Sequence, residues 1–193
     1  MTLEFTKNSK QNVGSAKGKT GGYAFFAPRD IAVPTSLDME LPAGYFNLGY
    51  VSDEGITSTP SYDSEEHKDL NGDVVDSGSS GYGLKVTTTL IETKKDVARV
   101  KYGDGNATDE AGVLTVHNKG TVGMRGHLVL ELVLKGKRRM RRVYPDVEMT
   151  ELGEEKVVSA DLFGQEATFT AYKDDATGDY CTDYIESTET VKE

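Results

Sequence analysis

Residues 127–144, HLVLELVLKGKRRMRRVY, decide the fold class because they are typical of two strands joined by a tight turn. Leucine occupies every second position from Leu128 to Leu134, which is the period of two that a pleated strand imposes. Lys135–Arg138 supplies a glycine-containing turn, and Arg139–Tyr144 is expected to return as the partner strand. We expect the leucine strand to be half buried on its leucine face, and Pro145 to end the partner strand because proline cannot donate a ladder hydrogen bond.

Similar strand-like runs recur along the chain, with many β-branched residues and 21 glycines among its 193 residues. The further predicted strands are Tyr23–Ala27, Phe46–Val51, Val74–Asp76, Gly83–Ile91, Val113–His117, Val147–Glu151, Val157–Leu162 and Ala167–Tyr172. A chain of this length can bury one core. Eight or more strands in one domain predict a β-sandwich or a partly closed barrel.

A single short helix is predicted after Thr93, which can cap it. Asp96 completes a capping-box-like pattern, Val97 and Val100 share one face, and Gly103 is a credible stop. One helix among many strands is expected to cover an open face or end of the sheet. The predicted fold class is therefore all-β with one flanking helix.

The segment before this helix is acidic and rich in serine and glycine. Residues 44–80 read GYFNLGYVSDEGITSTPSYDSEEHKDLNGDVVDSGSS, and residues 52–80 are expected to form a long loop because they lack the apolar residues to fold alone. Such a loop is expected to become ordered on contact with another molecule. The predicted organisation is an N-terminal arm over residues 1–21 and one domain over residues 22–193.

The net charge of the chain is −10, which argues against a surface that binds nucleic-acid phosphates. The charges are also separated along the sequence into acidic and basic blocks. Acids crowd residues 51–83, and six cations occupy the eight positions from Lys135 to Arg142. Each block is either a solvated face or a surface that pairs with the opposite charge on another copy. The second interpretation predicts inter-subunit contacts through Asp53, Glu54, Asp63, Glu65, Glu66, Asp69, Lys137, Arg138, Arg139, Arg141 and Arg142.

Motifs for catalysis or metal binding are incomplete in this sequence. Gly18–Thr20 is similar to the end of a phosphate-binding loop, but Val13 stands where that motif requires glycine. Asp104–Asn106 begins like a calcium loop that then lacks its glycine and its closing glutamate. The three histidines are not spaced as metal ligands; they are His67, His117 and His127. We expect no catalytic residue, no metal site and no cofactor.

Cysteine use and hydropathy indicate a protein made and folded in a cytoplasm. Cys181 is the only cysteine, so it cannot form an internal disulfide. No apolar run approaches the roughly 20 residues that span a bilayer, and the N-terminus lacks the apolar stretch of a signal peptide. We expect no membrane insertion.

An ordered set of landmarks follows from about Gly21 onward. They are GGYAFFAP, VPTSLDMELPAGYFNLGYVSDEGI, the acidic segment, LKVTTTLIETKKDVARVKYG, the leucine-rich strand with its basic return, RRVYPDVEMTELGE and ATFTAYKDDATGDY. In this order they resemble the major tail tube proteins of long-tailed, siphovirus-type bacteriophages. The Lys- and Gly-rich first twenty residues depart from that pattern.

The resemblance implies a β-sandwich with a flanking helix, six copies of which join into a ring. Stacked rings would form the tail tube, a conduit for double-stranded DNA during ejection into the host cell. The implied partners are other copies of the chain and the tape measure, tail terminator and tail tip proteins. The implied location is the virion tail, assembled in the host cytoplasm.

Two other functions compete with this interpretation. The tube of a contractile tail or injection machine shares the fold class and needs an outer surface that binds a sheath. A non-catalytic carbohydrate-binding β-sandwich would also be acidic and glycine-rich, but such proteins usually stack sugars on clustered Trp or Tyr, and this chain has no Trp.

Overall fold

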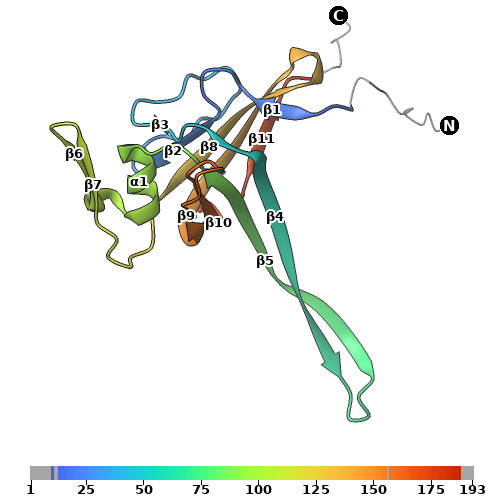
Figure 1. The fold of residues 1–193 in the computed structure, drawn as a ribbon. Helices are drawn as coiled ribbons and strands as arrows, with labels where there is room; N and C mark the ends of the chain where they lie inside the picture. The colour runs from blue at the N-terminus through green and yellow to red at the C-terminus, as the bar shows by residue number, and fades with distance from the viewer. Residues whose placement is uncertain (1–9, 11–12, 156, 188–193) are drawn as a thin grey trace, which may run out of the picture.

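The structure is a computed structural model that describes residues 10, 13–155 and 157–187 (Figure 1). Within these residues it is mostly β-sheet, with a single α-helix, which confirms the expected all-β fold with one helix. The elements are β1 (Ala16–Gly18), β2 (Ala24–Pro28), β3 (Phe46–Asn47), β4 (Val51–Lys68), β5 (Val74–Leu90), α1 (Lys95–Tyr102), β6 (Ala107–Glu110), β7 (Val113–Val116), β8 (Arg125–Leu134), β9 (Arg139–Glu155), β10 (Gln165–Ala171) and β11 (Thr182–Ile185), with 3₁₀ turns at Asp104–Asn106 and Lys135–Lys137.

The described strands form one antiparallel sheet in the order β3-β2-β8-β9-β10-β5-β4, with β1 beside β8 and β11 beside β9, while β6 and β7 pair separately. β2 and β10 are separated by two strands, which would place them about 14 Å apart in a flat sheet. The rings of Phe26 and Phe169 on these strands nevertheless lie 6.2 Å apart. The sheet is therefore curled around its core, and it does not close into a barrel.

The predicted hairpin of β8 and β9 is present, but β8 is buried on both faces rather than on its leucine face alone. Leu128 and Leu130 are buried on one face, and Val129 and Glu131 on the other. The connection between β2 and β3 covers this second face, and Arg141 on β9 donates hydrogen bonds to two of its backbone carbonyls. The second face of β8 is buried because this β2–β3 connection packs on the back of the strand.

Pro145 does not end β9, which continues to Glu155. The β8–β9 ladder has a bulge there, because Gly126 pairs with Val147 and Leu128 with Tyr144. Proline is tolerated at a bulge, where a ladder hydrogen bond is already missing. The strand thereby bends and passes from β8 to β10.

Helix α1 matches its prediction except at its start. Gly103 ends it with a φ of 95°, and Val97 and Val100 are buried against the core. The expected cap is wrong, since Lys94 occupies the N-cap position without a side-chain cap hydrogen bond. Asp96 instead pairs with Arg99 at 3.2 Å.

The expected loop over residues 52–80 is also wrong, because this stretch forms most of a long β4–β5 hairpin. Its ladder runs from Val51 opposite Leu90 to Lys68 opposite Val74. Backbone hydrogen bonding holds these polar strands together without a hydrophobic core. Conversely, the strand predicted at Val157–Leu162 is wrong, because these residues form turns and irregular structure.

Within the predicted N-terminal arm, β1 pairs with β8, and residues 1–9 and 11–12 lie outside the described residues. The boundary at residue 21 stays a prediction.

Candidate assembly surface

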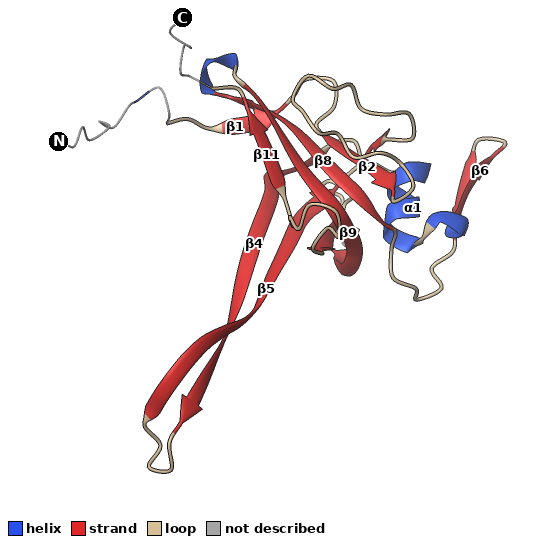
Figure 2. Cartoon of the chain, turned by 180° about the vertical axis from the view of Figure 1, so that it is seen from behind, coloured by secondary structure: helices blue, strands red, loops and turns tan. Residues whose placement is uncertain are grey.

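The β4–β5 hairpin extends well beyond the body of the molecule, as two views from opposite sides agree (Figures 1 and 2). Its strands stay paired almost to the tip, with register shifts after Asp63 and His67, and Asp69–Asp73 forms the turn. At the rise of a strand, the stretch from Ser58 to Leu70 spans roughly 40 Å. The hairpin is therefore a projecting arm rather than part of the packed sheet.

The turn at the tip is fixed by Asp69. Its carboxylate accepts backbone hydrogen bonds from Asn71 at 2.9 Å and Asp73 at 2.8 Å. These donors, Asp73 foremost, hold the pKa of Asp69 below its usual value because they stabilise the ionised form. The turn leaves the Leu70 side chain completely exposed at the apex.

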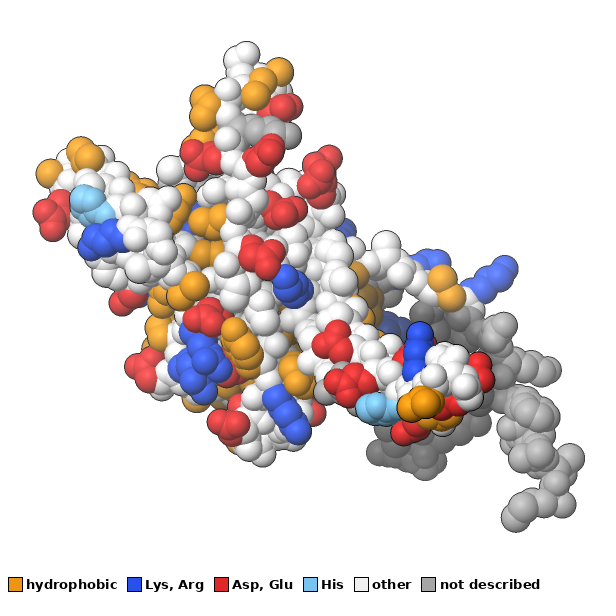
Figure 3. Space-filling model, turned by 90° about the horizontal axis from the view of Figure 1, so that it is seen from below, with side chains coloured by type: hydrophobic (Ala, Val, Ile, Leu, Met, Phe, Trp, Pro, Cys, Tyr) orange, Lys and Arg blue, Asp and Glu red, His pale blue; other side chains and the backbone are white. Residues whose placement is uncertain are grey.

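Acidic side chains surround this apex. We define the hairpin end as residues 65–76, whose exposed acids include Glu65, Glu66, Asp73 and Asp76. Seen from below, hydrophobic side chains at the tip are flanked by Asp and Glu (Figure 3). Of the other predicted contact acids, Asp63 lies nearer the middle of the arm, and Asp53 and Glu54 lie in a bulge at its base.

A row of tyrosines, which the sequence interpretation missed, lies along the arm. Tyr62 and Tyr82 are opposite each other in the ladder, with ring centroids 5.1 Å apart in an edge-to-face arrangement. Tyr180 continues the row, 4.8 Å from Tyr82. Tyr62 is 72% exposed, so this row presents aromatic surface to solvent.

Three of the predicted contact arginines have acidic partners within the same chain. Arg139 lies 2.8 Å from Asp38, and Arg142 forms a two-pronged pair with Asp183 at 2.7 Å. Arg141 pairs with Glu131 and is buried, so its side chain is not on the surface of the single chain. Three of the six cations of the basic block are thus neutralised in place along β9.

Cations without an acidic partner gather where β1 lies beside the β8–β9 turn, and Arg138 among them is only partly exposed. Lys17 on β1 is in register with Val133, next to the turn that carries the remaining lysines. We call this group the basic end; its members are Lys17, Lys19, Lys135, Lys137 and Arg138. No ion pair is formed by these five side chains within the part of the chain that the structure describes.

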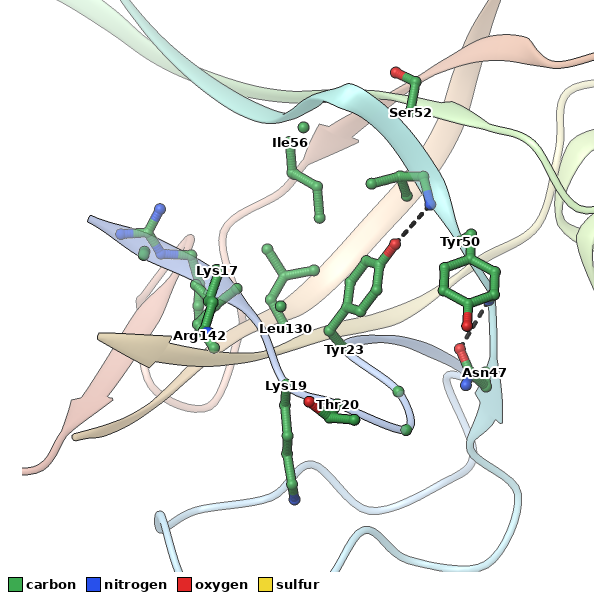
Figure 4. A pocket seen from close by; sticks show the side chains of 18 of the residues that line it. Lys17, Lys19, Thr20, Tyr23, Asn47, Tyr50, Ser52, Ile56, Leu130 and Arg142 are labelled. Carbon is green, nitrogen blue, oxygen red and sulfur yellow. Dashed lines mark hydrogen bonds between the residues drawn. The ribbon is translucent and has the colours of Figure 1, made fainter. Parts of the chain in front are cut away.

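A cleft of about 660 Å³ opens beside the basic end (Figure 4). Its apolar lining comes from Tyr23, Val51, Ile56, Leu130 and Leu132, on β4 and β8 and just before β2. The backbone N–H of Val51 donates to the Tyr23 hydroxyl at 2.7 Å, which ties the base of the arm to the start of β2.

The rim of the cleft is polar and includes Lys17, Lys19 and Arg142, with the Lys19 side chain directed away from the apolar floor (Figure 4). Gly18–Thr20, the stretch similar to a phosphate-binding loop, leads here from β1 into a turn and not into a helix. It therefore lacks the helix N-terminus that binds phosphate in that motif.

The described residues include the three histidines and Cys181. Within the described part of the chain, no group of three or more His, Cys, Asp or Glu side chains is placed to hold a metal ion. His127 is buried, and its Nδ1 forms a hydrogen bond with the Pro145 carbonyl, whereas His67 and His117 are exposed. Burial raises the pKa of the Cys181 thiol to about 11, which keeps it protonated and unreactive.

No helix among the described residues has both the length and the apolar character needed to cross a membrane.

The sequence also matches a known protein family. A sequence model of the family described as "Phage tail tube protein" matches residues 10–191, which include the projecting hairpin, the basic end and the cleft. No curated protein is similar enough to count as a match. The family match and the all-β fold make the protein a structural component of a bacteriophage tail, as the ordered sequence landmarks indicated. The chain belongs to the phage tail tube protein family.

Proposed function

We propose that the chain forms homohexameric rings that stack into the tail tube of a long-tailed phage, through which DNA passes into the host cell. Its family supports self-assembly into a tube. The observation that carries the proposal is the β4–β5 hairpin, a preformed arm whose end stands away from the rest of the described chain (Figure 2). The exposed Tyr62 and Leu70 on this ordered arm offer apolar surface to another molecule.

Uncovered sheet edges support ring formation. Among the described strands, β4 is the last of the sheet and pairs only with β5, and β3 ends the opposite side. Unpaired edges invite strand addition from other chains unless something covers them. A ring of identical subunits covers both edges of every copy.

The net charge of −10 suits a conduit for DNA, since an acidic subunit repels phosphate. The role is structural and non-enzymatic. Tube length and closure require other proteins of the tail, so we propose the tape measure, tail terminator and tail tip proteins as partners. Assembly takes place in the host cytoplasm before the tail joins the virion.

Electron microscopy and light scattering of purified protein test this proposal. Wild-type protein at high concentration is expected to form six-fold rings or hollow tubes. A variant in which residues 65–78 are replaced by Asn-Gly, so that a shorter hairpin closes between the paired residues Ser64 and Ser79, should stay folded but form no tubes.

The matched control shortens the β6–β7 hairpin, which lies apart from the main sheet, and should still form tubes. Wild-type protein that remains monomeric under all salt and concentration conditions would refute the proposal.

A further inference from the structure

We propose that the hairpin end of one copy occupies the cleft of a second copy, with Leu70 on the apolar floor and the acids against the lysines of the rim. This inference rests on the proposed tube and identifies both sides of one contact within it. Four observations carry it: reach, exposed apolar surface, charge and a fixed turn.

The length of the arm requires that the contact be between two copies of the chain. Ile56 and Ser58, at the base of the arm, line the cleft of their own chain. The paired strands hold Leu70 roughly 40 Å from this base, so the arm cannot fold back into its own cleft. The hairpin end and the cleft are different surfaces of the chain. A head-to-tail contact between them therefore propagates from copy to copy.

The two surfaces match in apolar character. Leu70 is fully exposed at the apex of the arm, and Val74 and Val75 beside the turn are more than half exposed. The cleft offers apolar side chains from Tyr23, Ile56 and Leu130, which point toward the same space (Figure 4). Insertion would remove apolar surface from water on both partners.

The two surfaces also match in charge. Of the cations at the rim, Arg142 already pairs with Asp183, which leaves Lys17 and Lys19 without an ion pair in the described chain. The acid of the cleft, Glu92, pairs with Lys94 at 2.8 Å and accepts the Tyr50 N–H. Among the residues that line the cleft in the described chain, the charges left without an ion pair are therefore those of the two lysines.

The hairpin end supplies the opposite charge. Glu65, Glu66, Asp73 and Asp76 are exposed and form no ion pair within the part of the chain described. Opposite potentials steer the two surfaces together and fix their orientation. The Asp69 turn is already closed in the single chain, so little conformational entropy is lost on docking.

Disulfide cross-linking tests the contact directly. In a Cys181→Ser background, Leu70→Cys is combined with Thr20→Cys at the cleft, and assembled protein is oxidised. Each copy gives one bond and receives one, so a ladder of linked multimers is expected on a non-reducing gel. The control pair Leu70→Cys with Lys119→Cys, away from the cleft, should give no ladder beyond dimers.

Charge reversal tests the same contact without cysteines. Lys17→Glu with Lys19→Glu is expected to raise the concentration needed for assembly by about tenfold or more, and high salt should shrink the difference. Adding Glu65→Lys and Glu66→Lys should restore assembly. Lys119→Glu with Lys173→Glu changes net charge equally and should leave assembly unchanged.

The outcomes separate this inference from the function on which it rests. Tubes that form normally without a ladder, or charge reversals that the compensating pair does not rescue, overturn the contact and leave the tube intact. Rings whose clefts hold a different segment of the chain, such as residues 1–12, overturn the contact in the same way. Wild-type protein that never assembles overturns the proposed function itself.

Discussion

The guanidinium of Arg141 lies 2.6 Å from the carboxylate of Glu131, and both side chains are buried between β9 and β8. The two residues are directly opposite in the ladder. Arg141 also donates to the carbonyls of Ser36 and Met39 at 2.7 and 2.6 Å. One buried cation thus holds the β2–β3 connection on the back of the sheet, with Glu131 neutralising it.

Glu131→Ala should strongly destabilise the subunit, because it leaves the Arg141 charge buried without its partner. The expected loss in the free energy of unfolding is about 3–5 kcal/mol, measured by urea denaturation at a concentration where the protein is monomeric. Glu151→Ala, which breaks the exposed pair with Lys85, should cost about 0–1 kcal/mol. Equal losses for the two variants would contradict the buried-pair argument.

Tyr144→Phe should also lower stability, since it removes a hydrogen bond that joins distant parts of the curled sheet. The Tyr144 hydroxyl lies 2.6 Å from that of Ser58 on β4. The expected cost is about 1–3 kcal/mol, because the Ser58 hydroxyl loses its partner. A double-mutant cycle with Ser58→Ala should show coupling between the two sites; strictly additive effects would speak against the bond.

Gly126→Ala should disturb the pairing of β2 with β8. An added Cβ would collide with the backbone carbonyl of Ala27, which cannot move without breaking the ladder. We expect a loss of about 1–3 kcal/mol and a lower melting temperature by calorimetry. Gly105→Ala, where an added Cβ meets no neighbouring atom within 4 Å, is the control; the idea fails if both variants melt together.

Cys181 should react slowly with thiol reagents in the folded subunit. Its pKa of about 11, raised chiefly by burial, leaves far less thiolate at pH 8 than an unfolded chain has. The reaction rate should therefore be about 100-fold slower than in denaturant, where the pKa returns to its usual value. The rate should keep rising with pH through about 10, since the thiol is still mostly protonated there. A folded-state rate equal to that in denaturant would show that the thiol is accessible and ionised.

Local periodicity made the core hairpin and the helix predictable. The leucine alternation from Leu128 to Leu134 gives β8, and the placement of Val97, Val100 and Gly103 gives α1. The second buried face of β8 was not predictable from this pattern, because the segment that covers it lies about 100 positions earlier in the chain. Likewise, the partner of Arg139 is Asp38, 101 positions away.

The projecting hairpin was missed because its strands carry no hydrophobic periodicity. Backbone ladders between polar residues such as Thr59 and Lys85 leave no signal in composition. One local signal was present: Asn71-Gly72 is a strong turn dipeptide, and Tyr62 and Tyr82 lie almost symmetrically about it. Strands extended outward from that dipeptide predict the hairpin and the tyrosine pair. The charge pattern alone identified the exposed acids. Their position at the tip of the hairpin could not be predicted without the fold.

The hairpin leaves the body of the subunit on one side only (Figure 1). If the proposed contact joins copies that all face the same way, the stack would have polarity: at one end the arms would point into solvent, and at the other the clefts would stand vacant. The two ends are chemically unlike, since the first is acidic and convex and the second basic and concave. In the proposed tube, growth that starts at one end and stops at the other would therefore need two chemically different capping proteins.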